Sequence, residues 1–169
     1  MSISELDEWL EEYKNNLATK TQTLVDRLLE VGIQVANMNT GEYAGCIIFS
    51  RHVDLGEDTC VGVLVAEDKQ KILRTWKYRD SVKGYEVSPL LLAEFGSGFL
   101  SEVLDDVAGV GQGTMPQQIH AFDEEGWHWV DEAGKYHHSI GEKPTHPMHS
   151  AMVQIMSDIN RIAKEVFNG

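Results

Sequence analysis

Large apolar side chains recur at steps of three and four residues through the first fifth of the chain, and this repeat limits the possible folds most. The repeat runs from Ile3 to Val35, with one skipped position at Lys20–Thr21. Such spacing places the side chains on one face of an α-helix, so the sequence predicts a single helix over residues 3–36. At about 1.5 Å per residue it would be roughly 50 Å long. A helix of this length can pack along its own sheet and also reach a neighbouring chain.

Three strand-like runs follow the helix, at residues 43–53, 59–66 and 70–78. Turn-like residues connect them at 54–58 and 67–69. Because these connections are short, the sequence predicts an antiparallel meander within a sheet that spans residues 43–78.

The middle of the chain begins with a short helix at residues 88–96. Ser88 is its expected N-cap, Pro89 its first residue and Gly96 its end. A buried strand is the alternative, because the leucines that follow Pro89 show no period. Residues 97–120 contain closely spaced glycines and few large apolar residues, so we expect a mobile loop there.

Residues 126–139 (GWHWVDEAGKYHHS) predict a β-hairpin with the four-residue turn Asp131–Gly134. Gly134 is expected to be left-handed, and His128 is expected to lie opposite His137. With this pairing, one face of the ribbon carries Trp127, Trp129, Tyr136 and His138. An isolated ribbon cannot keep that much aromatic surface in water, so the face is expected to pack on its own domain or on another chain.

An amphipathic helix is predicted at residues 146–167, with Thr145 as a candidate N-cap. The predicted fold class is therefore α+β, in a single domain over residues 1–169. Its parts are a long N-terminal helix, an antiparallel sheet made of a meander plus a C-terminal hairpin, and the amphipathic C-terminal helix.

Charge narrows the choice of partners. The formal net charge is −13 and the sequence pI is about 4.8. This argues against a surface that holds a nucleic-acid backbone, and favours partners that are basic or that bind through apolar patches. An acidic surface is also compatible with lining a channel through which DNA slides. We see no run that would span a membrane and no signal peptide, so we expect a cytoplasmic protein.

Five of the seven histidines lie within residues 126–152 and raise the question of a metal site. On the predicted register His128 and His137 could share a metal, with a third ligand from His120, His146, His149 or Asp131. No HExxH or paired-cysteine spacing accompanies them, and a three-residue turn would shift the pairing and remove the site. We therefore expect no metal and no cofactor, and keep a metal protein as an alternative.

Candidates for catalysis are weak. The glycine-rich loop lacks the Gly-Lys-Ser/Thr ending of a phosphate loop, and Gly96-Ser97-Gly98 lacks the spacing of a nucleophile elbow. Glu94 could serve as a general base, but a lone carboxylate at a helix end is more often a cap. We expect no catalytic residue and no enzyme.

The order of motifs in the second half of the chain carries a family resemblance. Glu94 to Gly98 (EFGSG) precedes the glycine-rich loop, and the WHW…D-x-x-G hairpin follows it. Pro147-Met148 with Ala151 then opens the last helix. In this order the chain resembles the neck, or tail-completion, family of long-tailed bacteriophages, over roughly residues 85–166.

The resemblance implies a structural virion protein at the head–tail junction, made in the host cytoplasm and assembled as a homo-oligomeric ring. Its implied partners are the connector, tail terminator and tail tube proteins, with no membrane, no sequence-specific nucleic acid and only passive contact with passing DNA. The residues expected at its interfaces are Glu94, Phe95, Gly96, Trp127, Trp129, Tyr136, Pro147, Met148 and Met152. Two alternatives stay open: a small metal-binding protein or metal-dependent enzyme built on the histidines, and an acidic inhibitor that mimics nucleic acid.

Overall fold

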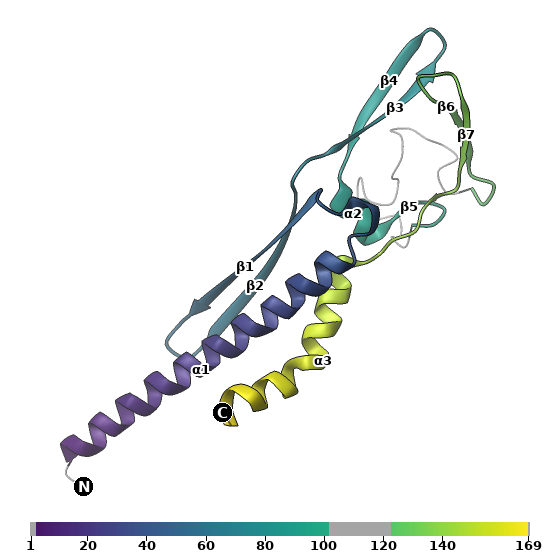
Figure 1. Cartoon of the computed structure of the whole chain (residues 1–169). Coiled ribbons are helices and arrows are strands. Elements are labelled where there is room, and N and C mark those ends of the chain that lie inside the picture. Colours follow the sequence, from purple (N-terminus) through teal and green to yellow (C-terminus); the bar gives the residue numbers. More distant parts are fainter. Residues whose placement is uncertain (1–2, 102–122, 169) are drawn as a thin grey trace. The chain divides into compact units, whose positions relative to one another are not determined.

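The computed structural model describes residues 3–101 and 123–168 (Figure 1). Its internal contacts fall into two compact units. Unit 1 comprises Met1–Val35, Phe49–Val65 and Ser150–Gly169, and unit 2 comprises Ala36–Ile48 and Ala66–His149. The prediction of a single domain is not tested by this division and stays a prediction.

The elements confirm the α+β class, with a long N-terminal helix, antiparallel hairpins and a C-terminal helix. In chain order they are α1 (Ile3–Met38), η1 (Gly41–Tyr43), β1 (Ile47–Leu55), β2 (Cys60–Asp68), β3 (Ile72–Tyr78), β4 (Ser81–Val87), α2 (Pro89–Phe95), β5 (Ser97–Gly98), β6 (Trp127–Val130), β7 (Tyr136–Ser139), β8 (Gly141–Glu142) and α3 (Pro147–Asn168). Within the described residues the strands pair as β1–β2, β3–β4, β5–β8 and β6–β7.

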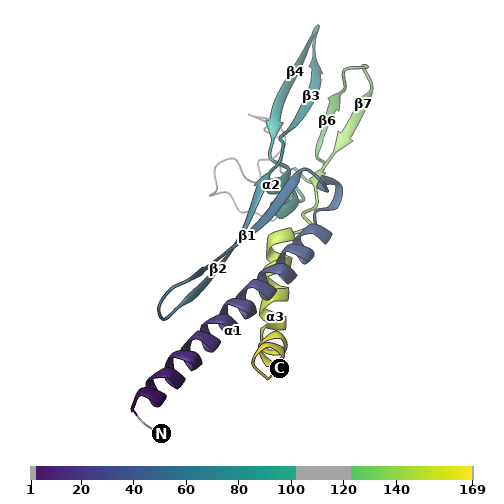
Figure 2. The ribbon, with the colours of Figure 1, turned by 60° about the vertical axis from the view of Figure 1, so that its left-hand side comes forward.

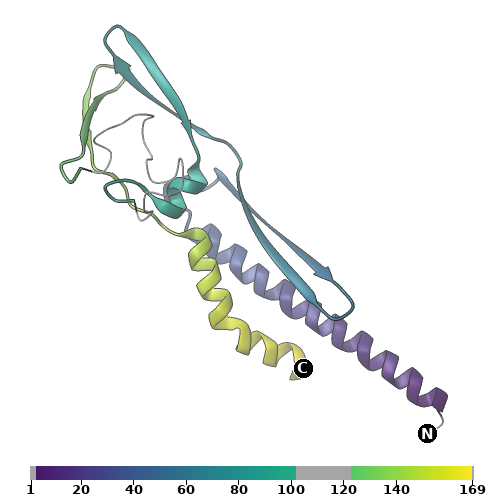
Figure 3. The same ribbon diagram turned by 180° about the vertical axis from the view of Figure 1, so that it is seen from behind.

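Unit 1 is built on α1, with the β1–β2 hairpin on one side of it and α3 on another (Figures 1 and 3). Glycine permits both approaches. A Cβ atom at Gly62 in β2 would lie 2.5 Å from Cγ1 of Val25 and 3.0 Å from Cδ1 of Leu29. A Cβ atom at Gly32 in α1 would lie 2.7 Å from Cδ1 of Ile155 in α3. The core of this unit therefore depends on close contact between elements.

Ion pairs add to these apolar contacts in unit 1. Arg51 of β1 places Nε 2.9 Å from Oδ1 of Asp26 and Nη1 2.9 Å from Oε2 of Glu30, so it ties the hairpin to α1. Arg27 of α1 lies 2.5 Å from Glu165 of α3. These side chains are partly exposed, so each pair contributes about 1 kcal/mol or less.

The strand pairing differs from the expected meander. β2 pairs with β1, whereas β3 pairs with β4, in a register from Ile72↔Val87 to Tyr78↔Ser81. Strand β4 was not predicted, because its sequence SVKGYEV contains Gly84 and polar residues of low strand propensity. Residues 41–43, which include the start of the first predicted strand, form the 3-10 helix η1.

In unit 2 the short helix α2 forms as predicted, and the alternative of a buried strand is wrong. The Ser88 side chain accepts a hydrogen bond from the Leu91 N–H at 3.1 Å, Pro89 opens the helix, and Gly96 ends it at a φ of 71°. Ser88 also donates to Asp68 at the end of β2. This bond fixes the start of α2 against the strand.

The structure also differs at the start of the predicted mobile loop. Ser97 and Gly98 form β5, which pairs antiparallel with Glu142 and Gly141 of β8. Ser97 is completely buried, and its hydroxyl accepts from the Glu142 N–H at 3.1 Å. Residues 102–120 of the predicted loop lie outside the described residues.

Candidate functional site

The register of the β6–β7 hairpin decides which aromatic side chains face together. The observed pairs are Trp127↔Ser139, His128↔His138, Trp129↔His137 and Val130↔Tyr136. The predicted register was therefore wrong by one residue. Because a slip of one residue reverses the face of every side chain on one strand, Tyr136 and His138 lie on the opposite face from Trp127 and Trp129.

The turn explains the shift. The Asp131 N–H donates to the Lys135 carbonyl at 3.0 Å, and the Gly134 N–H donates to the Asp131 carbonyl at 2.9 Å. Asp131 Oδ1 also accepts from the Lys135 N–H at 2.8 Å. Asp131 and Lys135 thus close a three-residue loop, with the predicted left-handed Gly134 at a φ of 84°.

The observed register separates the two histidines proposed as metal ligands. His128 lies beside His138, with ring centroids 4.6 Å apart and the rings tilted by 32°, whereas His137 stacks on Trp129 at 4.4 Å. His137 Nε2 is also 2.8 Å from Oδ2 of Asp131. Across residues 3–101 and 123–168, no three His, Cys, Asp or Glu side chains are grouped as metal ligands. His120 lies outside these ranges.

A groove in unit 2 gathers aromatic side chains from two hairpins, and we name it the aromatic groove. Its volume is about 650 Å³. It runs between β3–β4 and β6–β7, which lie side by side in Figures 1 and 2. Its lining includes Arg74, Trp76, Tyr85, Trp127, Trp129 and Glu142.

Strand alternation explains how β3 and β4 contribute to the aromatic groove. Arg74 lies opposite Tyr85 in the β3–β4 register, and Trp76 is two residues further along the same face. The rings of Trp76 and Tyr85 meet edge to face, with centroids 5.7 Å apart. On β6, Trp127 is 8% exposed and anchors that hairpin, while Trp129 is half-buried.

A polar network borders the aromatic groove. Glu142 of β8 pairs with Arg74 and accepts a hydrogen bond from the Tyr43 hydroxyl, and Arg74 Nη2 is 3.3 Å from that hydroxyl. Burial, reinforced by the Glu142 carboxylate, raises the pKa of Tyr43 well above its ordinary value. Burial also raises the pKa of Tyr85 to about 12, against the opposing effect of Arg74.

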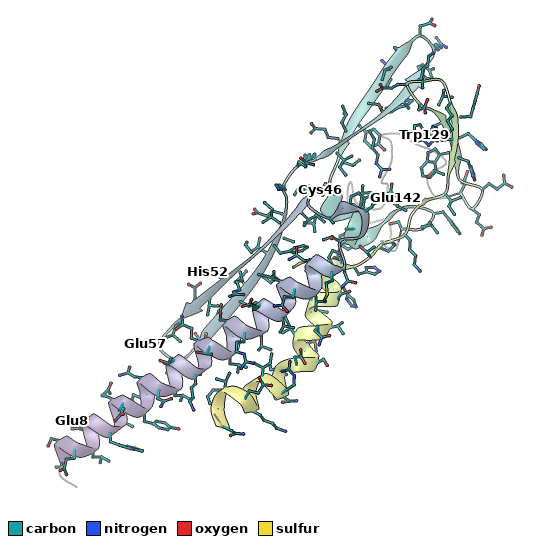
Figure 4. The ribbon with its side chains drawn as sticks, viewed as in Figure 1. Glu8, Cys46, His52, Glu57, Trp129 and Glu142 are labelled. Atoms are coloured by element: carbon teal, nitrogen blue, oxygen red, sulfur yellow. The ribbon has the colours of Figure 1, made fainter. Side chains whose placement is uncertain are left out.

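An ion pair joins Arg74 and Glu142, the two charged residues of this network. Burial lowers the pKa of Arg74, but the Glu142 charge and hydrogen bond outweigh burial and raise it. Arg74 and Glu142 therefore neutralise each other at the border of the groove. Figure 4 labels Glu142 on β8 and Trp129 on β6, the two elements that bring polar and aromatic chemistry together here.

Several residues expected at interfaces instead make hydrogen bonds or are buried within unit 2. Glu94 accepts from the Met148 N–H at 2.8 Å and from the His149 N–H at 3.0 Å, so its carboxylate caps the start of α3. The expected cap, Thr145, instead directs its N–H and hydroxyl to the Ala93 carbonyl. Phe95 is half-buried, and Gly96 and Pro147 are buried.

Other expected interface residues are available to a partner. Tyr136 is 79% exposed and Met152 is 51% exposed. Met148 is half-buried. The part of these residues in an interface stays a prediction.

Sequence reasoning did not place Arg74, Trp76, Tyr85 and Glu142 in a site. The alternation of Arg74 and Trp76 along a strand was a usable signal, but their neighbour Tyr85 belongs to the unpredicted β4. Glu142 reaches the network through the two-residue strand β8, which carries no periodicity.

No protein-family model matches this chain, and no curated protein or solved structure matches it either. Among the described residues, no helix combines the length and the apolar character that crossing a membrane requires. What this chain shows of its function therefore comes from its own residues: an acidic α+β protein with an aromatic groove in unit 2 and a long, partly uncovered helix in unit 1.

Proposed function

We propose that this protein is a non-catalytic structural component of the neck of a long-tailed bacteriophage, which acts by assembling with other chains at the head–tail junction. The observation that carries the assembly role is the uncovered apolar stripe on the first half of α1. The motif order between Glu94 and Ala151 supports the phage neck as the identity of the assembly.

The stripe on α1 is large and regularly spaced. Its members, with their exposed fractions, are Ile3 (82%), Leu6 (49%), Trp9 (54%), Leu10 (41%), Tyr13 (54%) and Leu17 (45%). Trp9 and Tyr13 stack on each other at 5.6 Å. The first turns of α1 extend beyond the other elements of unit 1 (Figure 2). A contiguous exposed apolar surface of this kind is typical of a protein–protein contact.

A second apolar surface lies on α3, in the same unit. Its members are Met152 (51%), Val153 (50%), Met156 (68%) and Ile159 (44%). Two different apolar surfaces on one unit suit a heterologous contact, in which the first surface of one subunit meets the second surface of the next. Contacts of this class close into rings when the rotation between subunits permits.

Charge favours this pairing over contact between two copies of α1. The α1 stripe is flanked by five acidic residues: Glu5, Asp7, Glu8, Glu11 and Glu12. Lys14 is the single basic residue in the sequence of residues 3–17. Two such segments side by side would repel each other, whereas the α3 segment carries balanced charge from Asp158, Arg161, Lys164 and Glu165.

The proposal is tested by locating the protein in virions of the phage that encodes it. Antibodies labelled with gold should mark the head–tail junction of purified particles. Labelling confined to unassembled protein in the lysate would reject the proposal. The alternatives of a metal protein and a nucleic-acid mimic gain no specific support from the described residues.

A variant pair tests the α1 stripe within the same experiment. Trp9→Ser with Leu10→Ser removes two exposed apolar side chains, so we expect the folded protein to be lost from particles. Leu73→Ser is the control, because Leu73 is 65% exposed on β3 in unit 2. Equal incorporation of both variants would show that the α1 stripe is not an assembly surface.

A further inference from the structure

The aromatic groove has the chemistry of a site for a cationic side chain. Four aromatic residues line it: Trp76, Tyr85, Trp127 and Trp129. The faces of tryptophan and tyrosine rings carry negative charge density and attract a cation within about 6 Å of the ring centre. Trp129 is half-buried and lines the groove. His137 stacks on one face of its ring, so a cation would stack on the other face.

The charged residues of the groove point to the same ligand class. Three carboxylates line it, at Asp131, Glu132 and Glu142, against the single guanidinium of Arg74. Glu142 already pairs with Arg74, and Asp131 is hydrogen-bonded to His137. Among the described lining residues, the three carboxylates therefore outnumber the single guanidinium. Hydrogen bonds from His137 and from the Lys135 N–H hold the pKa of Asp131 below its ordinary value, so Asp131 stays ionised near neutral pH.

These charges discriminate against anions and favour arginine among cations. A lining with three carboxylates and one guanidinium opposes a phosphate, and the whole chain carries a net charge of −13. A guanidinium is planar and weakly hydrated, stacks on aromatic rings and donates hydrogen bonds to carboxylates in its own plane. A lysine ammonium is not planar, so it can pair with the carboxylates but cannot stack flat on a ring in the same way.

We propose that the aromatic groove binds an arginine side chain presented by a basic segment of a partner protein. The inference rests on the proposed function, because it supplies the chemistry of one contact within the assembly. The guanidinium stacks on Trp129 and donates to the carboxylates of Asp131 and Glu132.

Nuclear magnetic resonance of the tryptophan indole N–H groups tests the site directly. Three of the four tryptophans line the groove, whereas Trp9 lies on α1 and serves as an internal control. The probe is the peptide acetyl-Gly-Arg-Gly-amide, and its control carries citrulline, which keeps the shape of arginine without its charge. We expect saturable shifts of the Trp76, Trp127 and Trp129 signals with the arginine peptide, and an unchanged Trp9 signal.

Two results would overturn the inference. The first is an equal response to the citrulline peptide, which would show that charge is not recognised. The second is a larger response of the same three indoles to single-stranded oligothymidine than to the arginine peptide, which would assign the groove to stacked bases.

Variants measure the contribution of each part. Trp129→Leu should raise the Kd for the peptide about tenfold through loss of the cation–π contact. Glu132→Gln should raise it roughly 2- to 5-fold, as expected for an exposed ion pair. Glu57→Gln is the matched control, because it removes the same charge from the exposed turn between β1 and β2 (Figure 4). If Glu57→Gln raised the Kd as much as Glu132→Gln, the effect would come from net charge alone, and the site would be rejected.

The two proposals can fail separately. Peptide binding by a protein that is absent from particles would reject the neck assignment and leave the arginine site in place. A protein that is present in particles but gives no indole shifts would reject the arginine site and leave the neck assignment in place.

Discussion

The two units of this protein are stabilised in different ways. In unit 1 two long helices and a hairpin pack through apolar side chains, and the close approaches at Gly32 and Gly62 are to side-chain atoms. In unit 2 short elements also bury apolar side chains such as Leu92 and Trp127, but a Cβ atom at Gly96, Gly126 or Gly141 would collide with backbone atoms. Side chains can adjust by rotation, whereas backbone held by hydrogen bonds cannot. Unit 2 should therefore tolerate substitution less well at its glycines.

The largest expected effect is Gly141→Ala in unit 2. Gly141 has a φ of 108°, and an added Cβ atom would overlap the Ser97 carbonyl oxygen. We expect a loss of more than about 3 kcal/mol in the free energy of unfolding, measured by urea denaturation. Gly134→Ala is the control, because Gly134 has a φ of 84° but no atom within 4 Å. It should cost only about 1–2 kcal/mol, and equal losses would show that backbone crowding is not what distinguishes Gly141.

The matching experiment in unit 1 is Gly62→Ala. The new Cβ atom would meet Cγ1 of Val25 at 2.5 Å, and Val25 is β-branched and rotates poorly. A loss of about 2 kcal/mol in unfolding free energy is expected from overpacking. Gly32→Ala should be close to neutral, since it meets the movable end of Ile155 and gains about 1 kcal/mol of helix propensity. A greater loss at Gly32 than at Gly62 would contradict the argument from side-chain rotation.

A smaller effect is expected for Glu94→Ala, which removes a polar contact of unit 2. The variant leaves the N–H groups of Met148 and His149 without their carboxylate acceptor. Thermal denaturation should report a loss of about 1 kcal/mol, as for other helix caps. Glu57→Ala removes an exposed carboxylate of unit 1 and serves as control. If the two variants lose equal stability, the cap contributes nothing.

The smallest effect is confined to alkaline pH. The pKa of Tyr85 is raised by burial to about 12, above its ordinary value of 10.0. Between these values the unfolded chain loses the proton and the folded chain keeps it, so stability falls as the pH rises above about 10. Tyr85→Phe should flatten this fall, as measured by urea denaturation between pH 9 and pH 11, a range chosen about the ordinary tyrosine pKa. An unchanged slope would mean that Tyr85 ionises freely in the folded protein.

Long periodic elements could be predicted from the sequence, and short ones in unit 2 could not. The helix expected at residues 3–36 is α1, and the one expected at 146–167 is α3. Strand β4 was missed because it contains Gly84 and polar residues, and β8 because two residues carry no pattern. The aromatic groove needs both, since β4 supplies Tyr85 and β8 supplies Glu142.

The sequence by itself determined the helices, the hairpin at residues 126–139 and the left-handed Gly134, because each depends on neighbours along the chain. Only the tertiary structure decided the rest. The register of β6–β7 depended on whether the loop has three or four residues, which the sequence pattern left open. The role of Glu94 followed from its contact with the distant start of α3. Hydrogen bonds between residues far apart in the chain leave no periodic pattern in the sequence, so they can be identified only in the folded structure.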